Sequence, residues 1–447
     1  MTASPILFRG GRLFDGHRFL DQTDLRSDAQ GKIEAIGNDL QPLAGEVVVE
    51  LDGKWLLPGL VDCHVHFREP GLVHKEGYLT GSSGALHGGV TTVMEIQNNP
   101  PLMETAELLR QKMVDLHGVS RVDFVPYGNL TVRSMDQIAA MVGLTPAVKC
   151  FLGCSTGSAG VADEKTMRML FTAAAQAGMK VVAHCEDDQI MADAQAHATA
   201  ETADRHDLMR PAVGEIESIR NAIRVAGEVG AELHVFHIST ADGGRLVAEA
   251  NDAGQAVTGT TGTQYLLVTA EEAYAAKQNR FKVNPAIKSD EHRQGLRELI
   301  RDGRLQGIGT DHAPHPLADK DRPYAKAPSG FPSIDLVLPM LFAIADDSGM
   351  DMSLLLRAMT SQPADEFGLS QKGRLQLGAD ADLVAVDPNV QRQVEESELP
   401  SKCKWSPFHG RQMRGFPLQV WLRGELVFDH GEFPLKPSGK PIFLSEN

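Results

Sequence analysis

The sequence predicts an α/β protein: a closed (β/α)8 barrel of the TIM type, with a small β-sandwich domain built from both ends of the chain. The middle of the chain alternates apolar runs of strand length with amphipathic segments, whereas both ends contain short strand-like runs separated by turn residues. The length of 447 residues favours a closed barrel over an open sheet. We therefore expect the barrel at residues 56–372 and the small β domain at residues 1–55 and 373–447.

The two ends of the chain carry the pattern of short strands. In the N-terminal part, residues 6–11, 32–37 and 46–50 are strand-like and are separated by glycine-containing turns. In the C-terminal part, residues 382–387 and 419–424 have the same character. Neither end contains a helical pattern of useful length, so we expect the two ends to assemble into one β domain.

The middle of the chain has the pattern of a parallel sheet covered by helices. Apolar runs of about strand length are followed by amphipathic segments of about three helical turns. The clearest runs are residues 91–96, 147–152, 180–184, 233–238 and 307–311, and the clearest helical segments are residues 104–114, 164–177 and 216–229.

Composition narrows the class of protein. Hydrophobic residues make up 42% and charged residues 23%, which is ordinary for a globular protein. The start of the chain lacks the basic and apolar segments of a secretion signal, and the five cysteines are an odd number, so we expect a cytoplasmic protein with reduced thiols. The net charge of −16 argues against nucleic acid or an anionic membrane as a partner, but it permits a small anionic substrate.

Five metal-capable side chains stand at the predicted carboxyl ends of the barrel strands, where the active sites of such barrels lie. A single histidine at a strand end is more often a structural residue than a ligand. Five such residues at one end of a barrel are a stronger signal, because imidazole and carboxylate are suitable zinc ligands. These residues are His64, His66, His184, His237 and Asp311.

Lys149 lies within an apolar run, where a charged amine is costly to bury. Two interpretations are open. The lysine can form a salt bridge with a carboxylate at a strand end, or its amine can react with carbon dioxide to give a carbamate that bridges two metal ions.

Alternation along the strands separates ligands from packing residues. Side chains two apart share a face, which groups Asp62 with the two histidines that follow it. Cys63, Cys150 and Cys185 alternate with the predicted ligands, so we expect them to pack toward the helices. His234 is out of phase with the histidine three residues later and is not expected to be a ligand.

The chain resembles the amidohydrolase superfamily and, within it, the bacterial long-chain dihydroorotases. The resemblance extends through almost the whole chain. The matching motifs lie at residues 58–71, 89–92, 148–153, 183–187, 234–240, 309–315, 378–384 and 402–408.

The resemblance implies a centre of two Zn²⁺ ions. One ion would be held by His64, His66 and Asp311, and the other by His184 and His237. A carboxylated Lys149 and a hydroxide would bridge them. Asp311 would also act as the catalytic general base and then as general acid.

The resemblance also implies a substrate and its contacts. Arg68, Asn98 and His315 would bind the substrate carboxylate, and Asn284 would also bind the substrate. A guanidinium matches a carboxylate with two parallel hydrogen bonds, whereas a structural salt bridge with Glu69 or another acid is the alternative for Arg68. The implied reaction is the reversible cyclisation of N-carbamoyl-L-aspartate to L-dihydroorotate in pyrimidine biosynthesis, by a homodimer.

Two departures from the family pattern border the pocket and keep other functions open. Gln97 stands where the family usually has proline, and residues 260–265 differ from the usual motif. The alternatives are another cyclic amidase, of the dihydropyrimidinase or allantoinase type, and a catalytically silent homologue that serves as the structural partner of a carbamoyltransferase.

Overall fold

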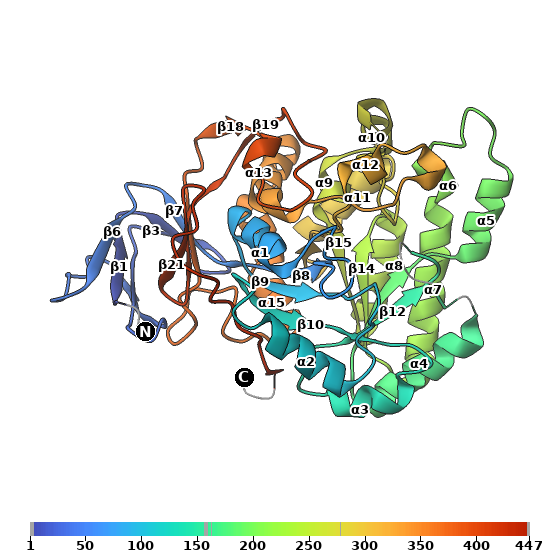
Figure 1. Ribbon diagram of the computed structural model, residues 1–447, viewed down its shortest axis with the longest axis horizontal. Coiled ribbons are helices and arrows are strands. Elements are labelled where there is room, and N and C mark those ends of the chain that lie inside the picture. Colours follow the sequence, from blue (N-terminus) through green and yellow to red (C-terminus); the bar gives the residue numbers. More distant parts are fainter. Residues whose placement is uncertain (1–3, 156–159, 162, 278, 445–447) are drawn as a thin grey trace.

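A computed structural model describes residues 4–155, 160–161, 163–277 and 279–444. Within them, a barrel of parallel strands surrounded by helices lies beside a smaller β domain, as Figure 1 shows. The first strands of the chain and the strands near its end lie together in that smaller domain. The predicted barrel with a small β domain from both ends of the chain is therefore confirmed.

The barrel has eight strand positions in the described residues, and every ladder between neighbours is parallel. The ring closes where Val65 pairs with His312 and the His66 amide donates to the His312 carbonyl at 2.8 Å. The strands are β8 (Leu60–Val65), β9 (Val90–Glu95), β10 (Asp123–Pro126) continued by β11 (Gly128–Asn129), β12 (Val148–Leu152), β13 (Val181–Cys185), β14 (Leu233–Ile238), β15 (Val257–Gly262) and β16 (Ile308–Gly309).

Helices follow the strands and cover the barrel. Several begin at a side chain that accepts a hydrogen bond from the first turn, such as Thr105, Asp163 and Thr240. No helix in the described part of the chain combines the length and apolar character that a membrane crossing requires. The helices are α1 (Tyr78–His87), α2 (Ala106–Leu116), α3 (Ile138–Met141), α4 (Glu164–Gln176), α5 (Asp188–Ala196), α6 (His206–Met209), α7 (Ala212–Val229), α8 (Ala241–Asp252), α9 (Thr263–Leu267), α10 (Ala270–Lys277), α11 (Asp290–Arg301), α12 (Leu317–Lys320), α13 (Val337–Ser348), α14 (Met352–Ala358) and α15 (Ser361–Glu366).

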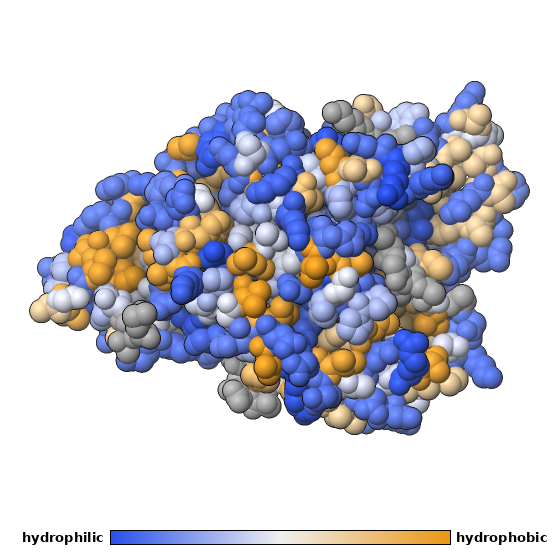
Figure 2. Space-filling model, in the orientation of Figure 1, coloured by the Kyte–Doolittle hydropathy of each residue, from blue (hydrophilic) through white to orange (hydrophobic). Residues whose placement is uncertain are grey.

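Two sheets form the small β domain. Apolar residues from both sheets meet in one core, in which the Phe8 and Trp421 rings lie 4.9 Å apart. In Figure 2 an apolar area lies over this domain. One sheet has the order β5 (Ile33–Gly37), β4 (Asp24–Ser27), β1 (Ile6–Arg9) and β6 (Val47–Glu50), and the other β21 (Glu425–Asp429), β20 (Pro417–Leu422), β17 (Leu383–Val386), β7 (Trp55–Pro58), β2 (Arg12–Phe14) and β3 (Phe19–Asp21). A separate pair is formed by β18 (Gln391–Gln393) and β19 (Gln412–Arg414).

A buried ion cluster joins the small domain to the barrel. The Lys372 ammonium lies 2.6 Å from the Asp123 carboxylate of β10 and 2.8 Å from the carboxylates of Asp380 and Asp382. Arg423 also pairs with Asp123. The three carboxylates lie close enough to hold a metal ion, but the ammonium already stands among them, so we interpret the cluster as structural.

The alternation rule holds for two of the three predicted packing cysteines. Cys150 and Cys185 pack in the apolar layer that includes the surrounding helices, as predicted. Cys63 instead belongs to the cluster inside the barrel, with Tyr127 and Phe236, so its prediction was wrong. The physical reason is that the pairing of β8 with β9 changes register within β8, and strict alternation does not survive such an irregularity.

Candidate metal centre and adjoining pocket

His64, His66 and Asp311 form a buried group at the carboxyl end of the barrel. The Nε2 atoms of His64 and His66 lie 3.4 and 3.2 Å from Oδ1 of Asp311. Nδ1 of His66 lies 2.9 Å from the Ile96 carbonyl, so this nitrogen donates and Nε2 keeps its lone pair for a ligand. One donor atom from each residue lies within 4.8 Å of the others, and together they can hold one metal ion.

His184 and His237 form a second pair beside the first group. Nδ1 of His184 lies 3.1 Å from Nε2 of His237, and the ring centroids of His64 and His237 are 5.1 Å apart. His237 has a φ of 43°, next to a change of register between β14 and β15. This irregularity explains how its ring reaches the centre although the adjacent Phe236 also packs inside the barrel.

The Lys149 amine is buried and has no hydrogen-bond partner among the described residues. It lies 4.9 and 4.8 Å from the ring centroids of Phe151 and Phe236. Burial lowers the pKa of Lys149 to about 8, which raises the share of nucleophilic free amine near neutral pH. The salt bridge that the sequence left open is absent from the described residues, and the chemistry of the site fits the carbamate interpretation.

The donor set suits a metal ion of the zinc type. Burial holds the pKa values of His64 and His237 well below the usual histidine value, so both rings are neutral and offer lone pairs. Imidazole and carboxylate donors in a buried pocket are the ligands that zinc prefers. Asp62 stands apart from this group, because its carboxylate accepts hydrogen bonds from the amide and the hydroxyl of Thr310.

Glu186 is a functional candidate that sequence reasoning missed. Its Oε2 lies 3.1 Å from Nε2 of His184, and it also pairs with Arg210. Burial would raise the pKa of Glu186, but the charge of Arg210 and the hydrogen bond with His184 together hold it below the usual value. Glu186 stands two residues after His184, and this same-face spacing was the available signal.

Arg68 lies in the same pocket as the metal-capable residues. Its Nη1 donates to Oδ1 of Asn98 at 2.5 Å, whereas Nε and Nη2 are buried without a partner among the described residues. The alternative of a salt bridge with Glu69 or another acid is not realised in the described residues, and the Glu69 carboxylate accepts from the Tyr78 amide. Burial lowers the pKa of Arg68 to about 10, so the group is still a cation at neutral pH.

The other two predicted substrate contacts differ in position. Asn284 lines the cavity together with Arg68 and Asn98. His315 is buried and is not among the residues that line this cavity. Its Nε2 donates to the Ser329 carbonyl at 3.0 Å, and its Nδ1 lies 3.2 Å from the Lys75 ammonium. Lys75 was also missed, because the contact joins residues 240 positions apart.

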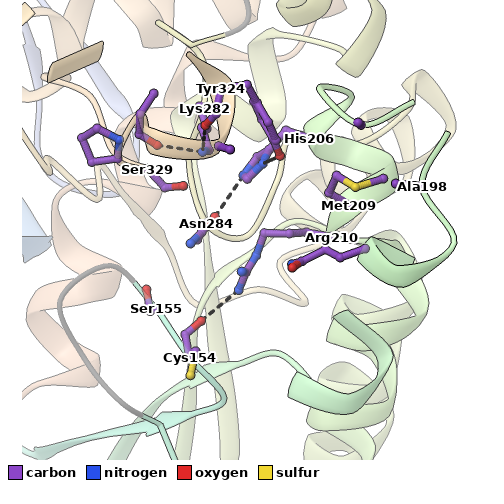
Figure 3. A pocket seen from close by; sticks show the side chains of 15 residues that line it. Cys154, Ser155, Ala198, His206, Met209, Arg210, Lys282, Asn284, Tyr324 and Ser329 are labelled. Carbon is purple, nitrogen blue, oxygen red and sulfur yellow. Dashed lines mark hydrogen bonds between the residues drawn. The ribbon is translucent and has the colours of Figure 1, made fainter. Parts of the chain in front are cut away.

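A larger cavity of about 510 Å³ adjoins the metal-capable pocket, with which it shares Ser155, Asn284 and Ser329. Figure 3 shows Arg210 and His206 on its wall, with the His206 ring bonded to Asn284. No acidic residue lines it among the described residues, whereas Arg210 and Lys282 do. The pocket therefore adjoins a wider recess whose lining includes two basic side chains, one of them paired with Glu186.

A model described as the Amidohydrolase family matches residues 55–427. The chain belongs to the amidohydrolase family. It is 33% identical to a dihydroorotase of Anoxybacillus flavithermus over 428 residues, covering 95% of this chain and 99% of the relative. It is 34% identical to a dihydroorotase of Halobacterium salinarum over 408 residues, covering 91% and 93%.

Solved structures agree with this amidohydrolase assignment. An L-hydantoinase (dihydropyrimidinase) from Arthrobacter aurescens matches with a TM-score of 0.92 and 28% identity, covering 99% of this chain and 100% of that one. A dihydropyrimidinase from Brevibacillus agri matches with a TM-score of 0.87 and 25% identity, covering 98% of each chain. The predicted family and fold are thereby confirmed, and the chain is a dihydroorotase-like hydrolase of the amidohydrolase family.

Proposed function

We propose that this amidohydrolase is a dihydroorotase, which interconverts N-carbamoyl-L-aspartate and L-dihydroorotate. The observation that carries the proposal is Arg68, a buried cation with two unpartnered nitrogens in the pocket that His64 and Asp311 also line. A buried guanidinium that forms no salt bridge and keeps two unpartnered nitrogens favours an anionic ligand, and the carboxylate of dihydroorotate supplies one. The similarity to dihydroorotases over nearly the whole chain supports the same reading.

Arg68 and Asn98 would bind and orient the substrate carboxylate. Asn98 accepts from Nη1 and so fixes the plane of the guanidinium. Nε and Nη2 then remain as a two-pronged donor, which matches the two oxygens of a carboxylate. Uncharged cyclic amides lack this interaction and would leave the cation unpaired.

Asp311 would move the proton. In the hydrolytic direction its carboxylate takes a proton from the water that attacks the ring amide, and then delivers that proton to the leaving ring nitrogen. Cyclisation uses the same group in the reverse order. Two Zn²⁺ ions, held by the histidine groups and Asp311, would polarise the amide carbonyl and lower the pKa of a bound water.

Lys149 would complete the centre as a carbamate. Its free amine attacks carbon dioxide, a nitrogen–carbon bond forms and one proton leaves to solvent. The product is an anion in place of an unpaired buried ammonium, and it would face the four imidazoles of the centre. The Lys149 amine has no hydrogen-bond partner among the described residues, and this supports the proposed carbamate.

The test compares substrates in one assay. Purified protein loaded with Zn²⁺ is given L-dihydroorotate, dihydrouracil and allantoin, and we expect turnover of dihydroorotate far above the other two. Arg68→Ala should raise KM for dihydroorotate at least tenfold, whereas Arg133→Ala, which removes an exposed cation, should leave it unchanged. Equal losses on charged and uncharged substrates in Arg68→Ala would contradict the anion site.

One observation favours a second candidate, a cyclic amidase for rings that carry a larger substituent. The adjoining cavity of about 510 Å³ is more space than the single carboxylate of dihydroorotate needs. A 5-substituted hydantoin in the same assay distinguishes the two: faster turnover of the hydantoin would favour this candidate. Turnover of none of these rings by fully metal-loaded protein would favour the catalytically silent homologue.

A further inference from the structure

A buried ion pair lies behind the loop that carries Arg68. Glu95 ends β9, and its carboxylate accepts from the Lys112 ammonium of α2. Both side chains are almost fully shielded from solvent. The same ammonium donates to Oε1 of Gln97 at 2.6 Å. Lys112 thus connects helix α2 to Glu95 and Gln97, the residues that come just before Asn98 in the chain.

Lys112 fixes the orientation of the Gln97 amide. An ammonium has donors only, so the amide must present its oxygen to Lys112 and its nitrogen to the opposite side. On that side Nε2 donates to the carbonyls of Pro70 at 2.7 Å and Asn99 at 3.2 Å. In the alternative orientation the Gln97 N–H groups would face the Lys112 ammonium. The Gln97 oxygen would then face the carbonyl oxygens of Pro70 and Asn99.

The Pro70 carbonyl is the point at which the two substrate-binding loops meet. It accepts from Nε2 of Gln97 and from Nδ2 of Asn99 at 2.8 Å. The next residue, Gly71, has a φ of 110°, and a Cβ there would lie 2.2 Å from the Pro100 carbonyl oxygen. The loops are therefore in close contact, and a displacement of Pro70 moves the backbone only two residues from Arg68.

We propose that Gln97 and Lys112 are positioning residues that set the selectivity for a substrate carboxylate. They act through the Pro70 carbonyl on Arg68, and directly along the chain on Asn98. Neither residue is among those that line the substrate cavity. This inference rests on the proposed function, because it explains what holds Arg68 and Asn98 in position to bind the substrate carboxylate. A fork that binds two oxygens loses affinity when it is displaced by a fraction of an ångström.

Two substitutions at one position test the role. Gln97→Glu keeps an oxygen for Lys112 but turns the second oxygen toward the Pro70 and Asn99 carbonyls, so it should push the loops apart. Gln97→Met removes the hydrogen bonds without that repulsion. For Zn²⁺-loaded protein we expect KM for dihydroorotate to rise at least tenfold in Gln97→Glu and about threefold in Gln97→Met. We expect kcat and metal content to change less than twofold in both.

The matched control is Gln371→Met. The Gln371 amide oxygen also accepts from a lysine, Lys32, at 3.3 Å, but it lies at the small β domain. This variant should keep the KM of the wild type. The inference is overturned if both Gln97 variants keep that KM, or if Gln371→Met raises it equally.

A structural readout separates this inference from the proposed function. Crystal structures of wild type and Gln97→Glu should show the Pro70 carbonyl and the Arg68 guanidinium displaced, whichever substrate the enzyme prefers. A wild type without activity on dihydroorotate, together with that displacement, would overturn the proposed function and keep the positioning role. An undisplaced Arg68 in Gln97→Glu would overturn the positioning role. If Gln97→Glu does not fold, the same comparison is made with Gln97→Met, where a smaller displacement is expected.

Discussion

The Glu186 carboxylate lies beside one ring nitrogen of His184, and the other ring nitrogen faces the candidate metal centre. The carboxylate lies 3.1 Å from Nε2, while Nδ1 faces His237 at the same distance. Arg210 donates to both oxygens of this carboxylate and keeps Glu186 charged. A charged carboxylate beside Nε2 favours the tautomer that carries its proton there, which leaves the lone pair on Nδ1 for a metal ion.

Glu186→Gln should therefore weaken metal binding while leaving the fold intact. We expect the affinity for Zn²⁺ to fall about 10- to 100-fold, because that is the usual effect of losing such a partner of a ligating histidine. Competition with a chelator measures the affinity. Glu164→Gln, which removes an exposed carboxylate bound to Arg168 and Arg224, is the control and should bind Zn²⁺ like the wild type.

Asp311→Asn separates proton transfer from metal binding. The amide oxygen can still join His64 and His66 around an ion, so the metal content should change little. The amide cannot accept a proton, and kcat should fall about 10²- to 10⁴-fold, the range for the loss of a general base. Elemental analysis and steady-state rates on the same sample measure both. Turnover close to that of the wild type would exclude the proton-transfer role.

Lys149→Ala should lose metal, because the substitution removes the anionic bridge. Added acetate or propionate can occupy the space left by the side chain, and we expect partial return of both metal and activity. Lys180→Ala provides the control, since this lysine pairs with Glu366 away from the centre. Full metal occupancy and activity in Lys149→Ala without any added acid would refute the carbamate.

The buried Glu366 carboxylate and its partners should make the stability of the protein depend on pH. Burial would raise its pKa, but His234 and Lys180 lower it from 4.5 to about 2. The folded state therefore gains stability above pH 4.5 and loses it as the pH falls toward 2. Between pH 6 and pH 3, metal-free wild type should lose about 2 kcal/mol more unfolding free energy than Glu366→Gln. Urea unfolding at both pH values measures it, and equal losses would contradict the assignment.

The sequence predicted which residues meet at the barrel end, because parallel strands bring their carboxyl ends to one place. His64, His184 and Asp311 are far apart in the chain, yet each ends or closely follows a strand, and the structure brings them together with Lys149. The spacing also separated His234 from the centre: its ring binds Thr258 and Glu366 instead. Whether these residues bind metal remains a prediction.

The details that alternation missed depend on irregular backbone and on long-range contacts. Cys63 faces inward because β8 changes register, and no residue type in that strand signals the change. The contact of Lys75 with His315 and that of Lys112 with Gln97 join separate elements. Such contacts depend on how loops and helices pack against the barrel. The alternation of residues within one strand does not predict that packing.

The small β domain has a consequence for the order of events during synthesis. In its larger sheet, β7 lies between β2 and β17, and β17 is in turn paired with β20. Strand β7 thus leaves the ribosome more than 300 residues before its partner β17 exists. At about 5–20 residues per second, β7 must wait for many seconds before β17 is made. The edge of β7 is then open to other chains, and completion of the C-terminal strands is the step that closes it.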